Sequence, residues 1–398
     1  MYVVKIISES RSLIERLISN CEKLFYSNFL WKFFCCYFEA TELLWYNRIM
    51  SETILAKILD KCIETWASDI HLSENKLIIF RVNGKLENFH AKWVLHKSHL
   101  EAIILELFNG DTLAMERFVI KKDMDFSYLY KQKHGFRINA FLKLWKLSLV
   151  MRQIASKAKT IQELGLPSGV AKFTQAKQWL ILITWPTGSW KSTSMVAILD
   201  QINETRTEHI LTIEDPIEFI FEDKKSIFSQ REVWKDTNSF SSAMRSAFRE
   251  DPDIIVVGEL RDKETISLAI ELAETGHLVF GTLHTSGSVS TISRIISFFP
   301  ASIQNSIYAR LGECLCWVLS QRLIPLKWKE GRVGIYELMI GTLGIRNIVS
   351  SWQLSQMEST IETGKQDGMI TMQEYAQGLF DEWKIEQKDY IHYFKDRG

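Results

Sequence analysis

Glycine is scarce in this chain, which has 19 glycines among 398 residues, below the usual share of about 7%. An excess of basic charge is also lacking, because 48 Lys and Arg balance 48 Asp and Glu. The overall charge therefore gives no support to a nucleic-acid-binding protein. The six cysteines form no paired C-x-x-C units. This argues against a zinc ribbon or a disulfide framework and favours reduced thiols in the cytosol.

The sequence also lacks a membrane-spanning run. Its most apolar stretch near the start, FLWKFFCCYF at residues 29–38, is short and contains Lys32. Residues 1–49 have neither the apolar core nor the small-residue cleavage site of a signal peptide. A helix on a membrane surface is one alternative for this segment. We expect instead that Met50 is the true start and that residues 1–49 are a spurious or unrelated extension.

The chain is long enough for two or three domains. Residues 50–152 predict a small α+β domain, since helical and strand-like patterns alternate there. Its helices are expected near 51–63 and 98–108, and its strands at 68–72, 77–82, 124–130 and 135–142. The pair Asn83-Gly84 predicts a tight turn. Residues 153–170 are expected to form a linker with a docking helix.

Beyond this linker, short apolar strands alternate with amphipathic helices, which predicts an α/β fold with a parallel sheet. This core is expected to cover residues 171–300. Its strands are expected at 180–184, 209–213, 254–257 and 278–283, and its helices at 192–203, 239–249 and 263–274. Residues 301–398 are expected to form a helical C-terminal subdomain.

A phosphate-binding loop is indicated where the strand ILIT (181–184) runs into WPTGSWKS (185–192) and then a helix. Lys191 would hold the β- and γ-phosphates of ATP, and Ser192 would ligate Mg²⁺. The pattern requires glycine at 185 and 190, however, and both positions are tryptophan. The nucleotide-binding residues expected from this loop are Trp185, Pro186, Thr187, Gly188, Ser189, Trp190, Lys191, Ser192 and Thr193.

Further motifs occur in a fixed order along the chain. They include ASDIHL (67–72), TIEDPIEF (212–219), IIVVGELRD (254–262) and TGHLVFGTLHTS (275–286). With these motifs residues 50–398 resemble the type II secretion and type IV pilus ATPase superfamily. The segment GIRNIV (344–349) and the lack of a four-cysteine zinc insertion make the chain most similar to the type IV pilus retraction ATPases.

This resemblance implies a RecA-like P-loop motor domain, a PAS-like N-terminal domain and a helical C-terminal subdomain. It implies ATP hydrolysis with Mg²⁺, a homo-hexamer, and a location at the cytoplasmic face of the inner membrane. There the motor would act on a pilus platform protein, with no nucleic-acid partner and no membrane anchor of its own. A pilus extension or secretion ATPase is the alternative, and a DNA-transfer ATPase is disfavoured by the lack of basic charge.

The resemblance also gives roles to residues outside the loop. Glu259 would orient the attacking water, and Glu214 would be a second catalytic carboxylate, with a structural acid as its alternative. His277 and His284 would sense the nucleotide, although structural histidines are an alternative. Arg137 and Arg152 would act as arginine fingers that reach a neighbour's nucleotide, or else are surface arginines.

Tryptophan is abundant where glycine is scarce, with 13 in the chain. Ten of them fall where the family usually has glycine: Trp66, Trp145, Trp179, Trp185, Trp190, Trp234, Trp317, Trp328, Trp352 and Trp383. Some bacteria read the codon UGA as glycine, while other codes read it as tryptophan. We therefore hypothesise that these tryptophans are a translation artefact. The alternative is a degenerate, non-hydrolysing ring subunit.

Overall fold

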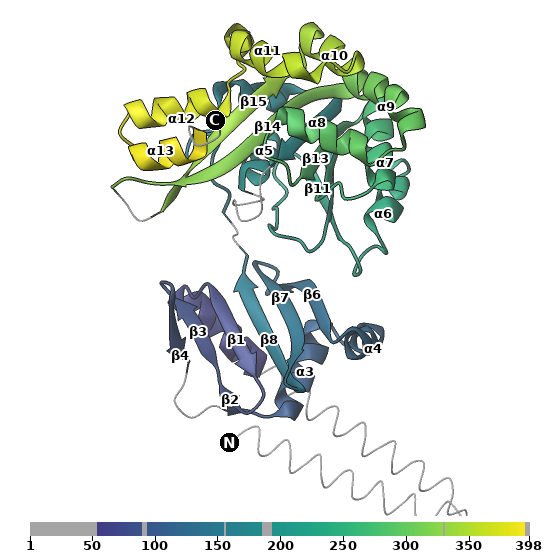
Figure 1. Ribbon diagram of the computed structural model, residues 1–398. Helices are drawn as coiled ribbons and strands as arrows, with labels where there is room; N and C mark the ends of the chain where they lie inside the picture. Colours follow the sequence, from purple (N-terminus) through teal and green to yellow (C-terminus); the bar gives the residue numbers. More distant parts are fainter. Residues whose placement is uncertain (1–53, 90–93, 155–156, 185–192, 329–330, 395–398) are drawn as a thin grey trace, which may run out of the picture. The chain divides into compact units, whose positions relative to one another are not determined.

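The computed structural model describes residues 54–89, 94–154, 157–184, 193–328 and 331–394 (Figure 1). Two compact units share the described chain. The first contains the residues up to Met124 together with Ala140–Val150. The second contains Asp125–Asn139 and the residues from Met151 onward, so the outer part of one N-terminal hairpin belongs to it.

The N-terminal region has a six-stranded sheet and is α+β, as expected from the sequence. The strand order is β4-β3-β1-β8-β7-β6. The strands are β1 (Asp69–Ser73), β3 (Ile79–Val82), β4 (Lys85–Asn88), β6 (Asp123–Tyr130), β7 (His134–Lys143) and β8 (Lys146–Gln153). A short pair, β2 (Lys76–Leu77) and β5 (Val94–Leu95), a helix over residues 54–65, α3 (Lys97–Leu107) and α4 (Thr112–Lys121) complete this region. The strands β4 and β8 and helix α4 were not predicted.

The second unit is built on a seven-stranded sheet in the order β11-β10-β12-β13-β9-β14-β15. Its strands are β9 (Trp179–Thr184), β10 (His209–Glu214), β11 (Ile227–Glu232), β12 (Ile254–Val257), β13 (Leu278–Leu283), β14 (Leu315–Pro325) and β15 (Arg332–Ile340). All neighbouring pairs are parallel except β14 with β15. The prediction of a parallel α/β core is therefore confirmed.

Helices cover both faces of this sheet, which explains why its strands are continuously apolar. Side chains of β9 alternate between two hydrophobic clusters. Ile181 and Ile183 pack with α5 (Thr193–Thr205), whereas Leu180 and Leu182 pack with the cluster of α6 (Phe240–Ala247), α7 (Lys263–Glu274) and α9 (Ala301–Cys314). The sheet is thus buried on both sides, and only the ends of its strands remain for a site.

The prediction of a helical subdomain over residues 301–398 is wrong in part. Strands β14 and β15 lie in this region and continue the seven-stranded sheet beyond β9. Their apolar runs are buried on both faces and lack the two-residue alternation of a half-exposed strand, so the pattern could not distinguish them from helix. The α-helices within this region are α9, α10 (Leu343–Ser350), α11 (Met357–Thr363), α12 (Met372–Asp381) and α13 (Gln387–Phe394), and α8 (Ser288–Ser297) precedes it.

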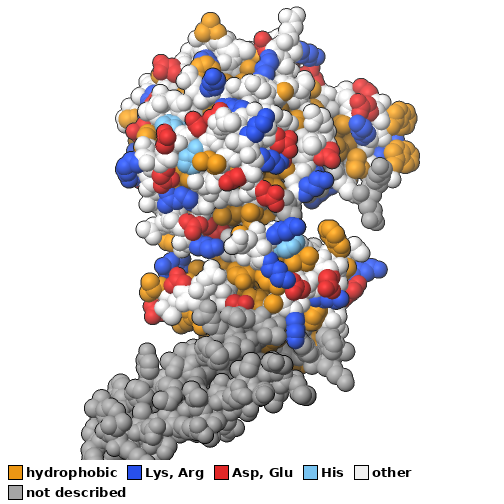
Figure 2. Space-filling view, turned by 180° about the vertical axis from the view of Figure 1, so that it is seen from behind, with side chains coloured by type: hydrophobic (Ala, Val, Ile, Leu, Met, Phe, Trp, Pro, Cys, Tyr) orange, Lys and Arg blue, Asp and Glu red, His pale blue; other side chains and the backbone are white. Residues whose placement is uncertain are grey.

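The linker expected at 153–170 begins with the last residue of β8, and its other described residues form no helix or strand until a 3₁₀ helix at Ser168–Gln175. This short helix packs in the same hydrophobic cluster as α5. No helix in the described part of the chain is both long and apolar enough to cross a membrane. Acidic and basic side chains are interspersed on the face seen in Figure 2, as the balanced composition predicts.

Candidate active site

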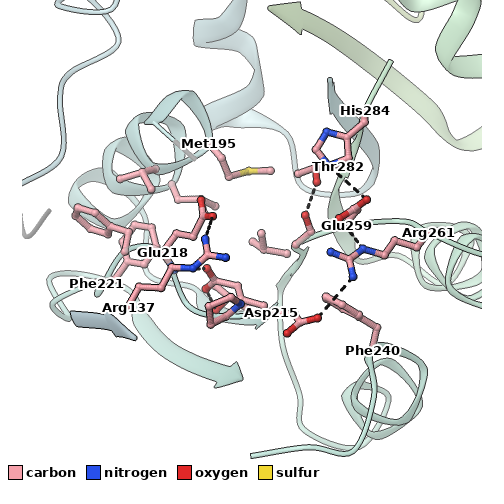
Figure 3. A pocket seen from close by; sticks show the side chains of 18 residues that line it. Arg137, Met195, Asp215, Glu218, Phe221, Phe240, Glu259, Arg261, Thr282 and His284 are labelled. Carbon is pink, nitrogen blue, oxygen red and sulfur yellow. Dashed lines mark hydrogen bonds and ion pairs between the residues drawn. The ribbon is translucent and has the colours of Figure 1, made fainter. Parts of the chain in front are cut away.

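A pocket lies where β10, β12 and β13 end, beside the first turns of α5 (Figure 3). Carboxyl ends of neighbouring parallel strands are where α/β proteins place their ligands. Four of the predicted catalytic residues line this pocket: Arg137, Glu214, Glu259 and His284. All of these residues belong to the second unit.

Glu259 occupies the centre of a charged cluster. It follows β12 after Gly258, and its carboxylate accepts a hydrogen bond from Arg261 Nε at 2.6 Å. His284 Nε2 lies 3.4 Å from its other oxygen. Arg261 also lies 3.6 Å from Asp215, so one guanidinium holds the two acidic side chains that follow β10 and β12.

The backbone before Glu259 is held close to the neighbouring strand. A side chain at Gly258 would place its Cβ 3.0 Å from the carbonyl oxygen of Ile213, which explains why glycine stands there. Leu260 N–H donates to the carbonyl oxygen of Thr282 at 2.9 Å, and the Thr282 hydroxyl donates to the carbonyl oxygen of Gly258. These bonds fix the direction in which the Glu259 side chain leaves the sheet.

Glu214 is the last residue of β10 and has an unusual acidity. Burial raises the pKa of its carboxyl to about 7, although hydrogen bonds from Thr212, the Glu218 N–H and Gln230 act in the opposite direction. The Thr212 hydroxyl donates to the carboxylate at 2.8 Å. A carboxyl with a pKa near neutrality in a pocket is suited to accept and release protons at physiological pH.

Arg137 enters the pocket from β7, on the Asp125–Asn139 segment. Its two terminal nitrogens lie 3.0 Å from Glu218 and 3.1 Å from Asp125. The guanidinium is thus held by acidic residues of its own chain. Arg152 was predicted to act beside it, but it is an exposed residue near the end of β8 and does not line this pocket.

The two histidines of the motif TGHLVFGTLHTS lie at opposite ends of β13. His284 follows the strand and lines the pocket. His277 precedes it, and its Nδ1 lies 3.0 Å from the carbonyl oxygen of Leu272 and 3.2 Å from the Thr275 hydroxyl. The pocket lies at the carboxyl ends of the strands, whereas His277 lies at the amino end of β13. The structure therefore does not bring His277 into this site.

The predicted phosphate loop lies outside the described residues from 185 to 192, and only its last residue, Thr193, is described, at the start of α5. The residues on either side of the loop contact β14. The Thr184 hydroxyl donates to Ser320 Oγ at 2.9 Å, and the Ser194 hydroxyl donates to Gln321 Oε1 at 2.6 Å. Ser320 and Gln321 are the first residues of the segment SQRLIP (320–325) in β14.

The charged side chains that line the pocket are suited to contact the phosphates of a nucleotide. The pocket combines acidic residues with Arg137 and Arg261, and it adjoins the N-terminal turns of α5, where phosphates are favoured. Among the described residues, no group of three or more His, Cys, Asp or Glu side chains is arranged to hold a metal ion. Magnesium that arrives with a nucleotide needs only one or two protein oxygens, because phosphates and waters supply the others.

Sequence reasoning missed several residues that complete the site. Asp215, Glu218 and Arg261 all lie within the motifs that carried the resemblance, and their positions beside Glu214 and Glu259 could have suggested them. Phe240 and Met195, which also line the pocket, gave no signal in the sequence.

Comparison with known proteins shows which proteins this chain is similar to. Residues 47–329 match the family model described as type II/IV secretion system protein. The type IV pilus retraction ATPase PilT of Pseudomonas aeruginosa is 45% identical over 314 residues, which cover 79% of this chain and 90% of that protein. A twitching motility protein of Neisseria gonorrhoeae is 44% identical over 257 residues, covering 65% of this chain and 69% of that protein. The crystal structure of a pilus retraction motor PilT with bound ADP superimposes with a TM-score of 0.78 at 36% identity, covering 86% of this chain and 97% of the other.

Proposed function

This chain belongs to the type II/IV secretion system protein family, and on that premise we propose that it is the ATP-hydrolysing motor that drives type IV pilus retraction. The observation that carries the proposal is the 45% identity to a retraction ATPase over 90% of that protein's length. The structure adds a pocket in which Glu259, Glu214, His284 and Arg137 converge. This pocket lies beside the helix that follows the predicted phosphate loop.

The proposed chemistry is attack of water on the γ-phosphate of ATP. Glu259 orients the attacking water and takes up its proton, because it projects from the carboxyl end of β12. Arg137 supplies positive charge for the transition state once it leaves Glu218. Lys191 and Ser192 would hold the phosphates and Mg²⁺, and the ion would neutralise charge on the phosphate oxygens.

Glu214 serves as a second carboxylate in this proposal. Its pKa near 7 allows it to exchange a proton with the site at physiological pH. His284 connects the end of β13 to Glu259, so a change at the carboxylate reaches that strand. Glu214 and His284 would therefore couple the state of the bound nucleotide to the seven-stranded sheet.

Assembly and location follow the family in this proposal. The chain would form a homo-hexamer at the cytoplasmic face of the inner membrane, attached only through a pilus platform protein. Arg152 would reach a neighbouring subunit, as expected from the sequence. For Arg137 we propose, in place of that expectation, action within its own chain, because its guanidinium pairs with Glu218 of the same chain. The N-terminal domain would have the PAS-like fold of related motors, and the helices after β15 would form the C-terminal part of the ring.

The choice between retraction and extension is testable in cells. We would express the chain, with glycine at the ten tryptophan positions identified above, in a Pseudomonas aeruginosa strain that lacks its retraction ATPase. A retraction motor is expected to restore twitching without changing the ability to make pili. The matched control is the same chain with Glu259→Gln, which should not restore twitching. Restoration of pili in a strain lacking the assembly ATPase, but not of twitching, would contradict the proposal and favour the extension function.

A further inference from the structure

Six tryptophans lie at backbone conformations that favour glycine. The structure describes eight of the tryptophans, and six of these have positive φ. Their φ angles are 55° at Trp66, 64° at Trp145, 92° at Trp179, 72° at Trp234, 62° at Trp352 and 60° at Trp383. Only a few per cent of residues other than glycine adopt positive φ, and bulky ones are outliers there. Fewer than one such tryptophan among eight would therefore be expected.

Three of these tryptophans end helices in the position that glycine normally holds. After each helix, the tryptophan N–H donates to the carbonyl oxygen three residues earlier. The N–H of the next residue donates to the carbonyl oxygen five residues earlier, and this pair of hydrogen bonds defines a Schellman motif. At the first helix end Trp66 donates to Ile63 and Ala67 donates to Cys62. At the second, Trp352 donates to Val349 and Gln353 donates to Ile348. At the third, Trp383 donates to Phe380 and Lys384 donates to Leu379. Helix α7 ends with the same two bonds, and there the residue is Gly276 with φ of 104°.

A fourth tryptophan lies in a tight hairpin turn. Leu144 and Trp145 alone connect β7 to β8, and both have positive φ. Turns of this kind strongly favour glycine at the second position. The hairpin between β3 and β4 has the same form, with Asn83 and Gly84 at φ of 49° and 81°. Trp145 thus occupies the place that Gly84 occupies in the neighbouring turn.

The surroundings of these side chains also fit glycine better than tryptophan. Trp66 and Trp145 are 86% and 88% exposed, although tryptophan is usually well buried. Trp317, in contrast, is buried in β14, and its indole Nε1 has no hydrogen-bond partner within the described chain. It lies where the pairing of β14 with β9 shifts register, and such irregularities often contain glycine.

We propose that these tryptophans are glycine in the protein that its native cell makes, because the gene uses UGA codons that the cell reads as glycine. The proposal includes Trp185, Trp190 and Trp328, which share the family's glycine pattern. Glycine at the ten positions raises the glycine count from 19 to 29 in 398 residues, close to the usual share of about 7%. Random decay of a gene would not place tryptophan selectively at left-handed positions and helix ends. With glycine at 185 and 190 the phosphate loop regains its required pattern.

The test is a direct reading of the gene and of the native protein. We expect UGA at all ten positions, and peptides from the native cell that carry the mass of glycine at 66, 145, 352 and 383. Peptides that contain Gly84 and Gly276 serve as controls, since those positions are written as glycine. Peptides that carry tryptophan, or UGG codons at these positions, would overturn the proposal. This test does not depend on the proposed function, because it reads composition rather than activity.

A separate observation concerns Glu232, the last residue of β11, which is 1% exposed. Its carboxylate accepts hydrogen bonds from two distant backbone groups, the Ser127 N–H at 2.9 Å and the Ile217 N–H at 3.1 Å. Ser127 lies on the segment that carries Arg137, and Ile217 lies between Glu214 and Glu218. One buried carboxylate therefore joins the two segments whose side chains meet in the pocket.

We infer that Glu232 is a positioning residue for Arg137. A carboxylate can accept both bonds, whereas an amide of the same shape offers one acceptor oxygen and places an NH₂ group against the other N–H. The pairing of Arg137 with Glu218 depends on the relative position of the segment with Ser127 and the segment with Ile217. Glu232 holds that position through its two hydrogen bonds. This inference rests on the proposed function, because it assigns Glu232 a role in hydrolysis.

A double-mutant cycle tests this role in the chain with glycine at the ten positions. Glu232→Gln is expected to lower kcat about tenfold with little change in KM for ATP, and to lower it no further when Arg137 is already alanine. The control is Glu208→Gln, which removes an ion pair with Arg206 away from the pocket. Additive losses in the double variant would contradict the positioning role. Full activity of Arg137→Ala alone would instead contradict the proposed function of Arg137.

Discussion

His284 Nε2 lies 3.4 Å from Glu259 Oε1, at the carboxyl ends of adjacent strands β13 and β12. Arg261 contacts the other oxygen of the same carboxylate at 2.6 Å. Glu259 is thus oriented from two sides by groups that can carry positive charge. These two contacts hold the carboxylate at the pocket, where a water-orienting residue is required.

We therefore predict that Glu259→Gln keeps ATP binding and loses hydrolysis. In the chain with glycine at 185 and 190, turnover should fall on the order of a hundredfold or more, because the amide cannot take up the proton of the water. Binding is checked by a fluorescent nucleotide and turnover by phosphate release. Near-normal turnover would remove Glu259 from this role. Glu264→Gln, which alters an exposed ion pair with Arg245, is the matched control.

The raised pKa of Glu214 predicts a pH-dependent contribution to stability. Its carboxyl is protonated more readily in the folded protein, with a pKa of about 7, than in the unfolded chain. Its contribution is therefore fully present below the unfolded pKa and is lost as pH rises through 7. The loss should be on the order of 3 kcal/mol, since one pKa unit represents roughly 1.4 kcal/mol.

Chemical denaturation from pH 4.5 to 8 measures this contribution. Glu214→Gln should remove most of the decline in the free energy of unfolding between pH 5 and 7.5. An unchanged decline in the variant would show that another group is responsible. In addition, kcat/KM of the chain with glycine at the ten tryptophan positions should rise with increasing pH, with a midpoint near pH 7, if ionised Glu214 is the active form.

Rings assembled from two kinds of mutant subunit distinguish the proposed roles of Arg137 and Arg152. Arg137 is paired with Glu218 of its own chain, so subunits with Arg137→Ala should gain no activity when mixed with Glu259→Gln subunits. If Arg152 reaches a neighbour, Arg152→Ala subunits mixed in the same way should recover part of the lost hydrolysis. Mixing Glu214→Gln with Glu259→Gln, two changes in one pocket, is the control without recovery. Recovery with Arg137→Ala would show that this arginine also acts between subunits.

Recombinant protein made with the ten tryptophans should be strained at its helix ends. Replacing Trp66, Trp352 or Trp383 by glycine is expected to stabilise it by about 1 kcal/mol each, because a left-handed conformation costs other residues roughly this much. Denaturation midpoints measure the gain. Trp328→Gly is the matched control, since Trp328 is exposed but has an ordinary φ, and it should give no gain. An equal gain at Trp328 would indicate that loss of an exposed aromatic ring, not backbone strain, is the cause.

The sequence predicted some elements to the residue. Strand β12, helix α7 and strand β13 begin and end where their patterns indicated. Helix α7 has a strong local start signal, since Asp262 and Thr265 form a capping box at its N-terminus. Strands β14 and β15 were missed because burial on both faces hides the strand period.

The sequence predicted those residues of the site that lie in recognisable motifs. Glu214, Glu259 and His284 lie at adjacent strand ends, so a parallel sheet brings them together without further information. His277 belongs to the same motif as His284 but lies one strand length away, at the opposite edge. Glu232 could not be predicted, because its partner Ser127 is 105 residues away and no local pattern connects them.

The two ends of the phosphate loop share one support. Thr184, before the loop, bonds to Ser320, and Ser194, after it, bonds to Gln321, the next residue of β14. Two neighbouring residues of that strand therefore hold the residues on either side of the loop. From Trp317 to Pro325, β14 also pairs with β15, which leads into the C-terminal helices, so the same strand contacts both sides of the phosphate loop and the strand that precedes those helices.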